Sequence, residues 1–359
     1  MQSNSIVPEM VIGLDVSDKY TQVCVLDGAG EVVEQGRLRT DPAAVRGRFS
    51  SVQRARVALE VGPHSSWLSR LLAELGHEVI VANPRKLRMI YQNDHKSDRA
   101  DAWYLAKVAR LDPELLGPVQ HRGPKTQADL SLVRARAALV AVRTNLISHV
   151  RSLSKVFGAR LRKTSTGRFS SAAASEIPMD LQPALKPLLD TIAHLTEQIR
   201  AYERRMRDLC RQRYPHTELL QQVTGVGPVT ALTYVLTLED PQRFGKSRAV
   251  GSYLGLTCRK DQSGHQDPEL RITKAGDRAV RFLLVQAAHY ILGPFGPDTD
   301  LRRWGLVLAS RGRKNAKKRA VVAVARKLAV LLHRLWVTGG VYEPLRNSQS
   351  ATALTASAS

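Results

Sequence analysis

The sequence predicts an α/β domain followed by two mainly helical regions. Short β-rich runs alternate with helical patterns up to residue 111, two Ala/Leu/Arg-rich helical patterns cover residues 126–158 and 181–212, and a glycine pair interrupts apolar helical stretches after residue 216. With 359 residues, 43% of them apolar, the chain is long enough for two or three domains. We expect these domains at residues 1–120, 121–215 and 216–345, with residues 346–359 as a disordered tail.

The first domain begins with three β-rich runs, residues 11–16, 21–26 and 31–39, joined by tight turns that predict an antiparallel meander. Helical and strand patterns then alternate. Three strands followed by such an alternation is the element order of a ribonuclease-H-like domain. The later elements are expected as strands at 55–61 and 77–82 and helices at 66–75 and 98–111.

The middle region contains two long helical patterns separated by the Ser-rich residues 164–175. The two helices are consistent with an antiparallel pair, with a dimerising coiled coil, or with two members of an ordinary bundle. In the third region, Gly225 and Gly227 lie between apolar helical stretches in a pattern that resembles a helix–hairpin–helix. The turn of that motif meets DNA phosphate through backbone N–H groups, although a simple packing turn is an equal alternative.

The net charge indicates the class of partner. Lys and Arg exceed Asp and Glu by 54 to 32, a formal charge of +22 that favours a polyanion, nucleic acid first and anionic membrane second. No apolar run is long enough for a transmembrane helix, and the N-terminus lacks the layout of a signal peptide. Three distant cysteines indicate neither a disulfide framework nor a zinc site, so we expect a soluble cytoplasmic protein without membrane contact.

Four carboxylates are candidates for chemistry. Asp15 and Glu60 come at the ends of predicted strands, and Asp98 and Asp101 are three residues apart, which places them on one face of a helix. If the two strands are neighbours, all four converge at one end of the sheet, where Mg²⁺ would offset their repulsion and two such ions clamp a phosphodiester. The alternative is a turn aspartate and a solvated helix face.

A basic run and a polar loop complete the candidates. Residues 311–319 contain six Lys or Arg, and residues 301–340 contain eleven and no acid, which favours phosphate contact over a merely solvated face. Ser263 lies in the polar loop 259–265. On composition alone it is no better a nucleophile than Ser247 or Ser252, because a serine needs an activating neighbour.

Two sets of motifs resemble a known family. Gly13-Leu-Asp15, Leu59-Glu60-Val-Gly62 and Lys96-Ser-Asp98-Arg-Ala-Asp101 are similar to the acidic motifs of DEDD transposases of the insertion sequence one-ten family, eleven-eleven subgroup. Residues 226–231, 253–256, 263–264, 271–276 and 314–319 are similar to its C-terminal domain. The resemblance extends from about residue 10 to 345.

The resemblance implies a RuvC-like domain, a helical coiled-coil dimerisation segment and a C-terminal domain with a nucleophilic serine. Members are recombinases guided by a structured bridge RNA that pairs with target and donor DNA, with the protein as a tetramer, a dimer of dimers, acting at the bacterial nucleoid. It implies Mg²⁺ at Asp15, Glu60, Asp98 and Asp101, and Ser263 as the nucleophile that forms a phosphoserine, with acids and serine from different subunits. Nucleic-acid contacts are expected from Gly225, Gly227, Lys274, Arg311, Arg313, Lys314, Lys317, Lys318 and Arg319.

Three other functions fit parts of the sequence. Sugar kinases share Gly-Leu-Asp as a phosphate loop, but the later Asp-Gly-Gly adenosine motif is missing. A Mg²⁺-dependent nuclease or junction resolvase would need the carboxylates and not Ser263, whereas a non-catalytic DNA- or RNA-binding protein would need neither. A protein–phosphate ester retains the bond energy for rejoining that hydrolysis discards, so Ser263 separates a strand-transfer enzyme from a hydrolase.

Overall fold

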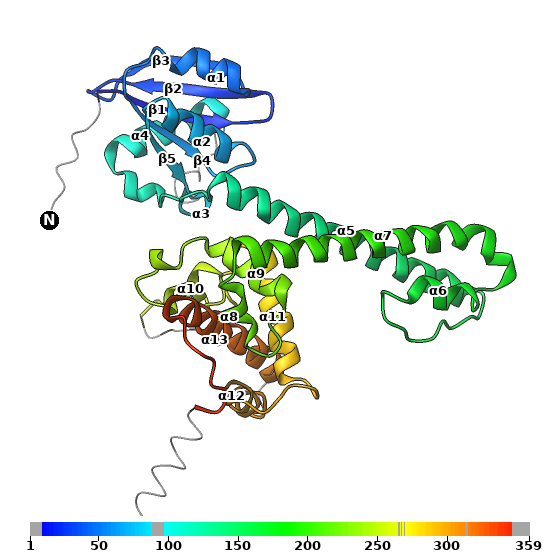
Figure 1. Cartoon of the computed structure of the whole chain (residues 1–359). Helices are drawn as coiled ribbons and strands as arrows, with labels where there is room; N and C mark the ends of the chain where they lie inside the picture. Colours follow the sequence, from blue (N-terminus) through cyan, green and yellow to red (C-terminus); the bar gives the residue numbers. More distant parts are fainter. Residues whose placement is uncertain are drawn as a thin grey trace, which may run out of the picture. The chain divides into compact units, whose positions relative to one another are not determined.

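A computed structural model describes residues 9–87, 97–264, 266, 268, 270–312 and 315–346. The chain divides into two compact units, Met1–Gly123 and Pro124–Ser359, which we call the N-terminal unit and the C-terminal unit (Figure 1). Each is described by itself below. No described helix combines the length and the apolar character that a membrane crossing requires.

The N-terminal unit is built on a five-stranded sheet in the order β3-β2-β1-β4-β5. The predicted meander is confirmed, because β1 pairs antiparallel with β2, and β2 with β3. On its other side β1 pairs parallel with β4, and β4 with β5, which agrees with the predicted ribonuclease-H-like order. The strands are β1 (Val11–Val16), β2 (Tyr20–Leu26), β3 (Val32–Arg39), β4 (Arg56–Glu60) and β5 (Glu78–Ala82).

Helices cover both faces of this sheet. On one face, α1 (Pro42–Phe49) and α2 (Ser65–Glu74) bury Phe49, Leu68 and Leu72 against strand residues such as Leu14 and Leu59. On the other face, α4 (Asp98–Leu111) buries Leu105 and Ala109 in one cluster with strand residues. Alternating strand side chains therefore serve two apolar layers. The remaining elements are α3 (Pro84–Leu87) and η1 (Pro113–Leu116).

Helix α1 is absent from the sequence prediction. Its sequence has no continuous apolar face at helical spacing, and only Val45 and Phe49 of its eight residues are buried. The start signal is nevertheless present, since Asp41 caps the helix by accepting a hydrogen bond from the Ala44 amide (2.9 Å) and Pro42 follows it.

The C-terminal unit begins with the two long helices, α5 (Pro124–Val156) and α7 (Gln182–Arg213), which are an antiparallel pair within one chain. Arg136 donates to Glu203 and Arg143 to Thr196, so residues advance along one helix as they recede along the other. The predicted antiparallel pair is thus observed within one chain, whereas dimerisation through it stays a prediction. Between these helices lie α6 (Phe169–Ala174) and η2 (Met179–Leu181).

The rest of the C-terminal unit is a helical core around α9 (Pro228–Leu238), in which every residue from Thr230 to Leu238 is buried. The Tyr234 hydroxyl donates to the Ala329 carbonyl (2.7 Å), and burial raises the pKa of Tyr234 well above its usual value. Around α9 lie α8 (Thr217–Gln221), η3 (Pro241–Arg243), α10 (Arg248–Tyr253), α11 (Arg278–Leu292), α12 (Asp300–Ala309) and α13 (Ala316–Thr338).

Candidate functional site

Asp15 and Glu60 lie next to each other at one edge of the sheet. Asp15 is the penultimate residue of β1, and Glu60 is the last of β4. The two strands pair in register through Leu14 and Leu59, so the next residues along are these two carboxylates. Neighbouring strands are about 4.8 Å apart, which brings the two backbones as close as a sheet allows.

The two carboxylates also share a face. An added Cβ on Gly13 would overlap the Ala102 carbonyl of α4, so this position of β1 faces that helix. Ala58 of β4 clusters with Leu105 and Ala109 of the same helix. Side chains two residues apart point the same way, and therefore Asp15 and Glu60 lie on the α4 face.

Helix α4 brings two more carboxylates to this edge. Val11 clusters with Leu105 and Ala109, whereas Gly13 meets Ala102, so the helix runs antiparallel to β1 and begins where β1 ends. Asp98 and Asp101 are in its first turn, one turn before the buried Ala102 and Leu105. We call Asp15, Glu60, Asp98 and Asp101 the acidic edge.

The acidic edge suits a divalent cation in donor chemistry, since carboxylate oxygens are the ligands that Mg²⁺ takes. It is not a closed ligand set. Among the described residues, no three His, Cys, Asp or Glu side chains lie close enough to hold a metal ion. The ends of strands and helix fix where the carboxylates gather, but ligand distance depends on side-chain rotamers that these elements leave open.

Ser263 lies at the tip of a small hairpin in the C-terminal unit. Its sides are joined by the Arg259 amide donating to the Arg271 carbonyl (3.0 Å) and the Thr273 amide donating to the Thr257 carbonyl (2.8 Å). At the tip, Ser263 and Gln266 exchange backbone hydrogen bonds of 3.2 and 3.0 Å, with Gly264 in the turn at φ +54°. The serine is exposed.

The base of this hairpin, which we call the serine hairpin, is held by backbone contact. Gly255 (φ +68°) and Gly276 (φ +67°) lie so close to the chain opposite that an added Cβ would overlap the backbone of Ala275 and Tyr253 respectively. The Arg281 guanidinium donates to the carbonyls of Leu254 (3.0 Å) and Ala275 (2.6 Å). Sequence reasoning missed this arginine, whose only signal is its place in the first turn after the cap residue Asp277.

The other two candidate serines belong to the helical core, Ser247 half-buried and Ser252 exposed. The Ser247 hydroxyl is hydrogen-bonded to Nδ1 of the buried His333 (3.0 Å), and Ser252 is a helical residue of α10. The structure thus separates three serines that composition could not: Ser263 alone of the three is at a hairpin tip.

The basic residues predicted to contact phosphate lie at the start of α13 and in the segments that contain Lys274 and Arg311. Lys317, Lys318 and Arg319 are exposed in the first turn of α13, which has no acidic residue in that turn. These positive side chains lie beside the positive end of the helix dipole, and both favour the binding of an anion at the start of α13. Arg311 and Lys274 are also exposed, the latter with φ +54°, whereas Arg313 and Lys314 lie outside the described residues.

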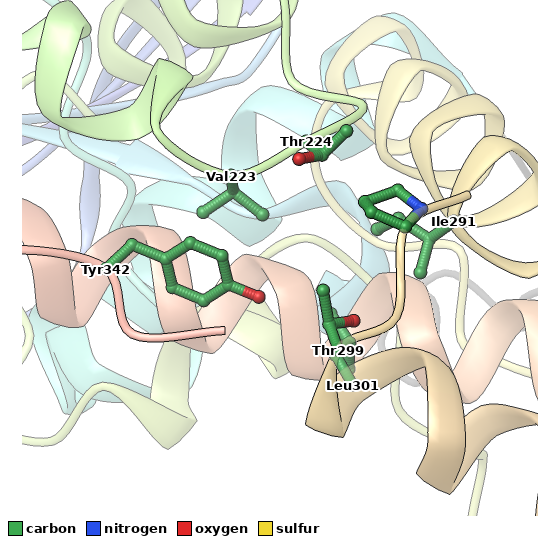
Figure 2. A pocket seen from close by; sticks show the side chains of 7 residues that line it. Val223, Thr224, Ile291, Thr299, Leu301 and Tyr342 are labelled. Carbon is green, nitrogen blue, oxygen red and sulfur yellow. The ribbon is translucent and has the colours of Figure 1, made fainter. Parts of the chain in front are cut away.

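The glycine turn between α8 and α9 is partly a packing turn. Gly225 has φ +95° and faces α11, where an added Cβ would meet the Ala287 carbonyl at 3.3 Å. Gly227 is exposed at the start of α9. Beside the turn lies a cavity of about 10 Å³, too small for a nucleotide (Figure 2). It is lined by Val223, Thr224, Ile291, Pro297, Thr299, Leu301 and Tyr342.

Comparisons with known proteins agree with both sets of motifs. A family model described as transposase, of the DEDD type named for IS110, matches residues 12–157, and one described as transposase of the IS116/IS110/IS902 family matches residues 217–299. A probable family 20 transposase of Pseudomonas aeruginosa is 31% identical over 342 residues, which cover 93% of this chain and 98% of the relative. The chain belongs to the IS116/IS110/IS902 family of transposases.

Relatives from other bacteria are similar over most of their length. The transposase for IS1111A of Coxiella burnetii is 27% identical, covering 90% of this chain and 89% of the relative. The transposase for IS1328 of Yersinia enterocolitica is also 27% identical, covering 83% and 91%. This family member is accordingly an enzyme, a DNA transposase, and DNA is its partner.

Proposed function

We propose that this transposase cleaves and rejoins DNA by serine chemistry assisted by Mg²⁺, guided by a bridge RNA. The observation that supports it is that the chain contains both an acidic edge, in one unit, and an exposed serine on a hairpin with a locked base, in the other. The designation DEDD refers to four acidic residues and to no serine, so the role of Ser263 must be tested separately from that of the carboxylates.

In the proposed reaction, Oγ of Ser263 attacks the scissile phosphorus and loses its proton to solvent or to a carboxylate. A P–Oγ bond forms as the bond from phosphorus to one deoxyribose oxygen breaks, and that oxygen leaves as a hydroxyl. The reverse attack by another strand's hydroxyl releases the serine and completes strand transfer. Asp15, Glu60, Asp98 and Asp101 would hold Mg²⁺, which when bound stabilises charge on the phosphate.

The locked hairpin suits a nucleophile. A phosphorus at in-line distance must meet an oxygen that is already positioned, because placement supplies much of the rate enhancement. The interlocked glycines Gly255 and Gly276, with Arg281, fix the two ends of the serine hairpin. Its exposed tip leaves the oxygen accessible to a duplex.

We further propose a composite assembly, a dimer of dimers in which the acidic edge and Ser263 that act together come from different subunits. The division into residues 1–120, 121–215 and 216–345, with the antiparallel α5–α7 pair as the dimerisation segment, belongs to this proposal. The basic residues of the C-terminal unit, together with the backbone at Gly227, would bind phosphates of DNA and RNA without reading sequence.

The test is covalent trapping on DNA. The full-length transposase, with Mg²⁺ and a substrate carrying a phosphorothiolate at the cleavage site, is expected to form an adduct that mass spectrometry maps to Ser263. Ser263→Ala should lose it and retain binding, whereas Ser252→Ala, an exposed serine in α10, should form it normally. Cleavage by Ser263→Ala without adduct would instead establish hydrolysis. A discrete RNA co-purifying with the protein tests guidance.

A further inference from the structure

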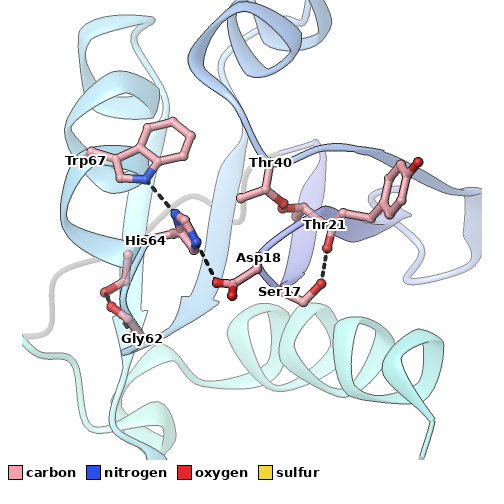
Figure 3. Close-up of polar contacts among 9 residues, drawn as sticks. Ser17, Asp18, Thr21, Thr40, Gly62, His64 and Trp67 are labelled. Atoms are coloured by element: carbon pink, nitrogen blue, oxygen red, sulfur yellow. Dashed lines mark hydrogen bonds and ion pairs between the residues drawn. The ribbon is translucent and has the colours of Figure 1, made fainter.

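Beyond the acidic edge, two loops are tied together by a chain of side chains. The turn after β1 contains Asp18, and the loop after β4 contains His64. Nε2 of His64 lies 3.0 Å from Oδ1 of Asp18, and the Trp67 indole N–H donates to Nδ1 of His64 (3.1 Å). Figure 3 shows the imidazole between the indole and the carboxylate. We call Asp18, His64 and Trp67 the relay.

The relay fixes one tautomer of the histidine. An indole nitrogen can only donate, so Nδ1 must accept and carries no proton in the neutral ring. The proton of the neutral ring is then on Nε2, and this N–H donates a hydrogen bond to the Asp18 carboxylate. Trp67 packs against the apolar cluster under α2, and its ring meets the imidazole edge to face at 6.1 Å. The relay therefore extends from the core to the loop surface.

Each loop has hydrogen bonds of its own. In the turn after β1, the Ser17 hydroxyl donates to the Tyr20 carbonyl (2.6 Å). In the loop after β4, the Ser65 hydroxyl accepts from the Gly62 amide (3.1 Å) and donates to the Gly62 carbonyl (2.7 Å). A hydrogen bond between two loops that are each braced in this way limits the separation of the strand ends from which they start.

That separation matters for Asp15 and Glu60, which repel each other where the paired β1–β4 register ends, one residue past Leu14 and Leu59. The relay does little for folding, because the Asp18 side chain is 89% exposed and exposed pairs contribute about 1 kcal/mol or less. We propose that the relay is a positioning device that holds Asp15 and Glu60 at the separation at which they share one divalent cation. This inference rests on the proposed role of the acidic edge.

The test measures Mn²⁺ binding to the full-length protein by electron paramagnetic resonance, without DNA. His64→Asn removes the donor that reaches Asp18 and should raise the Mn²⁺ concentration at half-saturation by up to about fivefold, the most that an exposed pair worth about 1 kcal/mol can contribute. His64→Gln, whose amide nitrogen replaces Nε2, should restore binding to the wild-type value. Asp18→Asn keeps the acceptor oxygen and should behave like His64→Gln.

Two controls separate the possible failures. Asp27→Asn alters a carboxylate in the β2–β3 turn at the opposite edge of the sheet and should leave the isotherm unchanged. Asp15→Asn should abolish high-affinity binding. A wild-type isotherm in His64→Asn together with lost binding in Asp15→Asn overturns the relay and leaves the proposed function standing. A wild-type isotherm in Asp15→Asn overturns the metal site and the relay with it.

A second measurement needs no metal. At a pH at which the ring is neutral, the ¹⁵N shifts of His64 in the wild-type protein should report the tautomer with its proton on Nε2. The Trp67→Phe variant, which lacks the N–H, should shift this balance toward the Nδ1 tautomer. A wild-type ring protonated at Nδ1 contradicts the relay, whatever the binding data show.

Discussion

The two units of this transposase differ in charge and in how they present their functional groups. The N-terminal unit has 16 Lys and Arg against 15 Asp and Glu, a net charge of +1, whereas the C-terminal unit has 38 against 17, or +21. The nearly neutral unit presents the acidic edge on the ends of two strands and a helix. The basic unit presents its serine and most of its cations on a hairpin, loops and a helix start.

The difference indicates a division of labour. A cation site needs carboxylates in a unit whose other charges nearly balance, because a strongly positive field would lower cation affinity. Phosphate binding instead needs the summed charge of many side chains. We therefore expect substitutions in the N-terminal unit to affect chemistry and those in the C-terminal unit to affect affinity, apart from the serine hairpin.

The largest effect is expected from Asp15→Asn, which removes one negative charge from the acidic edge without changing side-chain size. Strand cleavage should fall by about 10³-fold or more, because stabilisation of phosphate charge is lost. DNA affinity should stay within about twofold, since phosphate affinity comes from cations. The measurements are single-turnover cleavage and a binding isotherm with the same DNA.

Asp27→Asn is the matched control, and we expect it to cleave at the wild-type rate. Its hydrogen bond from the Glu31 amide lowers the pKa of Asp27, and an asparagine can accept the same bond. A folded Asp15→Asn protein with full activity would remove the acidic edge from the mechanism and end the proposed contrast between the two units.

The next effect concerns the serine hairpin. Gly255→Ala adds a Cβ that overlaps the Ala275 backbone at a residue with φ +68°, so it should destabilise the C-terminal unit by about 2 to 4 kcal/mol. Denaturant melts should show this transition shifted and that of the N-terminal unit unchanged. Gly312→Ala has a similar φ of +70° but open space, and its expected cost is about 1 to 2 kcal/mol. Equal costs would contradict the close approach.

How far the sequence predicts this molecule depends on whether a feature is local. Helix α4 was predicted over residues 98–111 and is observed as Asp98–Leu111, because a cap at Ser97 and buried Ala102, Leu105 and Ala106 are local signals. The β1–β4 pairing that sets Asp15 beside Glu60 is non-local, but it follows from the predicted strand order and is observed. A metal site shared by all four carboxylates stays a prediction.

Other features could not be predicted. Nothing near Ser263 in the sequence distinguishes it from Ser247, whose hydrogen bond to His333 spans 86 residues. The relay is similar, since Asp18 and His64 are 46 residues apart. In the sequence, Asp18 and His64 each follow a predicted strand, but this predicts a contact between them only when β1 and β4 are known to be neighbours.

The third prediction tests the charge of the C-terminal unit. Replacing Lys317, Lys318 and Arg319 by alanine should weaken DNA binding and lower the slope of log affinity against log salt by about 3, if each contacts one phosphate. The same number of charges is removed by alanine at Arg204, Arg205 and Arg207, which are exposed on α7. If both triple variants lose the same slope, net charge matters and the start of α13 is no specific contact.

The smallest effect separates the units by pH through two histidines, both with lowered pKa. Burial lowers the pKa of His216 in the C-terminal unit, where its ring stacks on Trp336 at 4.9 Å. Burial, then Arg70 and Arg122, lower the pKa of His121 in the N-terminal unit. A histidine that is harder to protonate when folded binds more protons when unfolded, so stability is full above about pH 6.5 and falls below it.

We therefore expect denaturant midpoints to fall between pH 7.5 and 5.5, and each histidine to act on its own unit. His216→Gln should reduce the pH dependence of the C-terminal transition, because glutamine does not titrate, and should leave the other transition unchanged. His121→Gln should do the reverse. If either variant shifts both transitions equally, the two units unfold together, and the contrast between them holds for chemistry but not for stability.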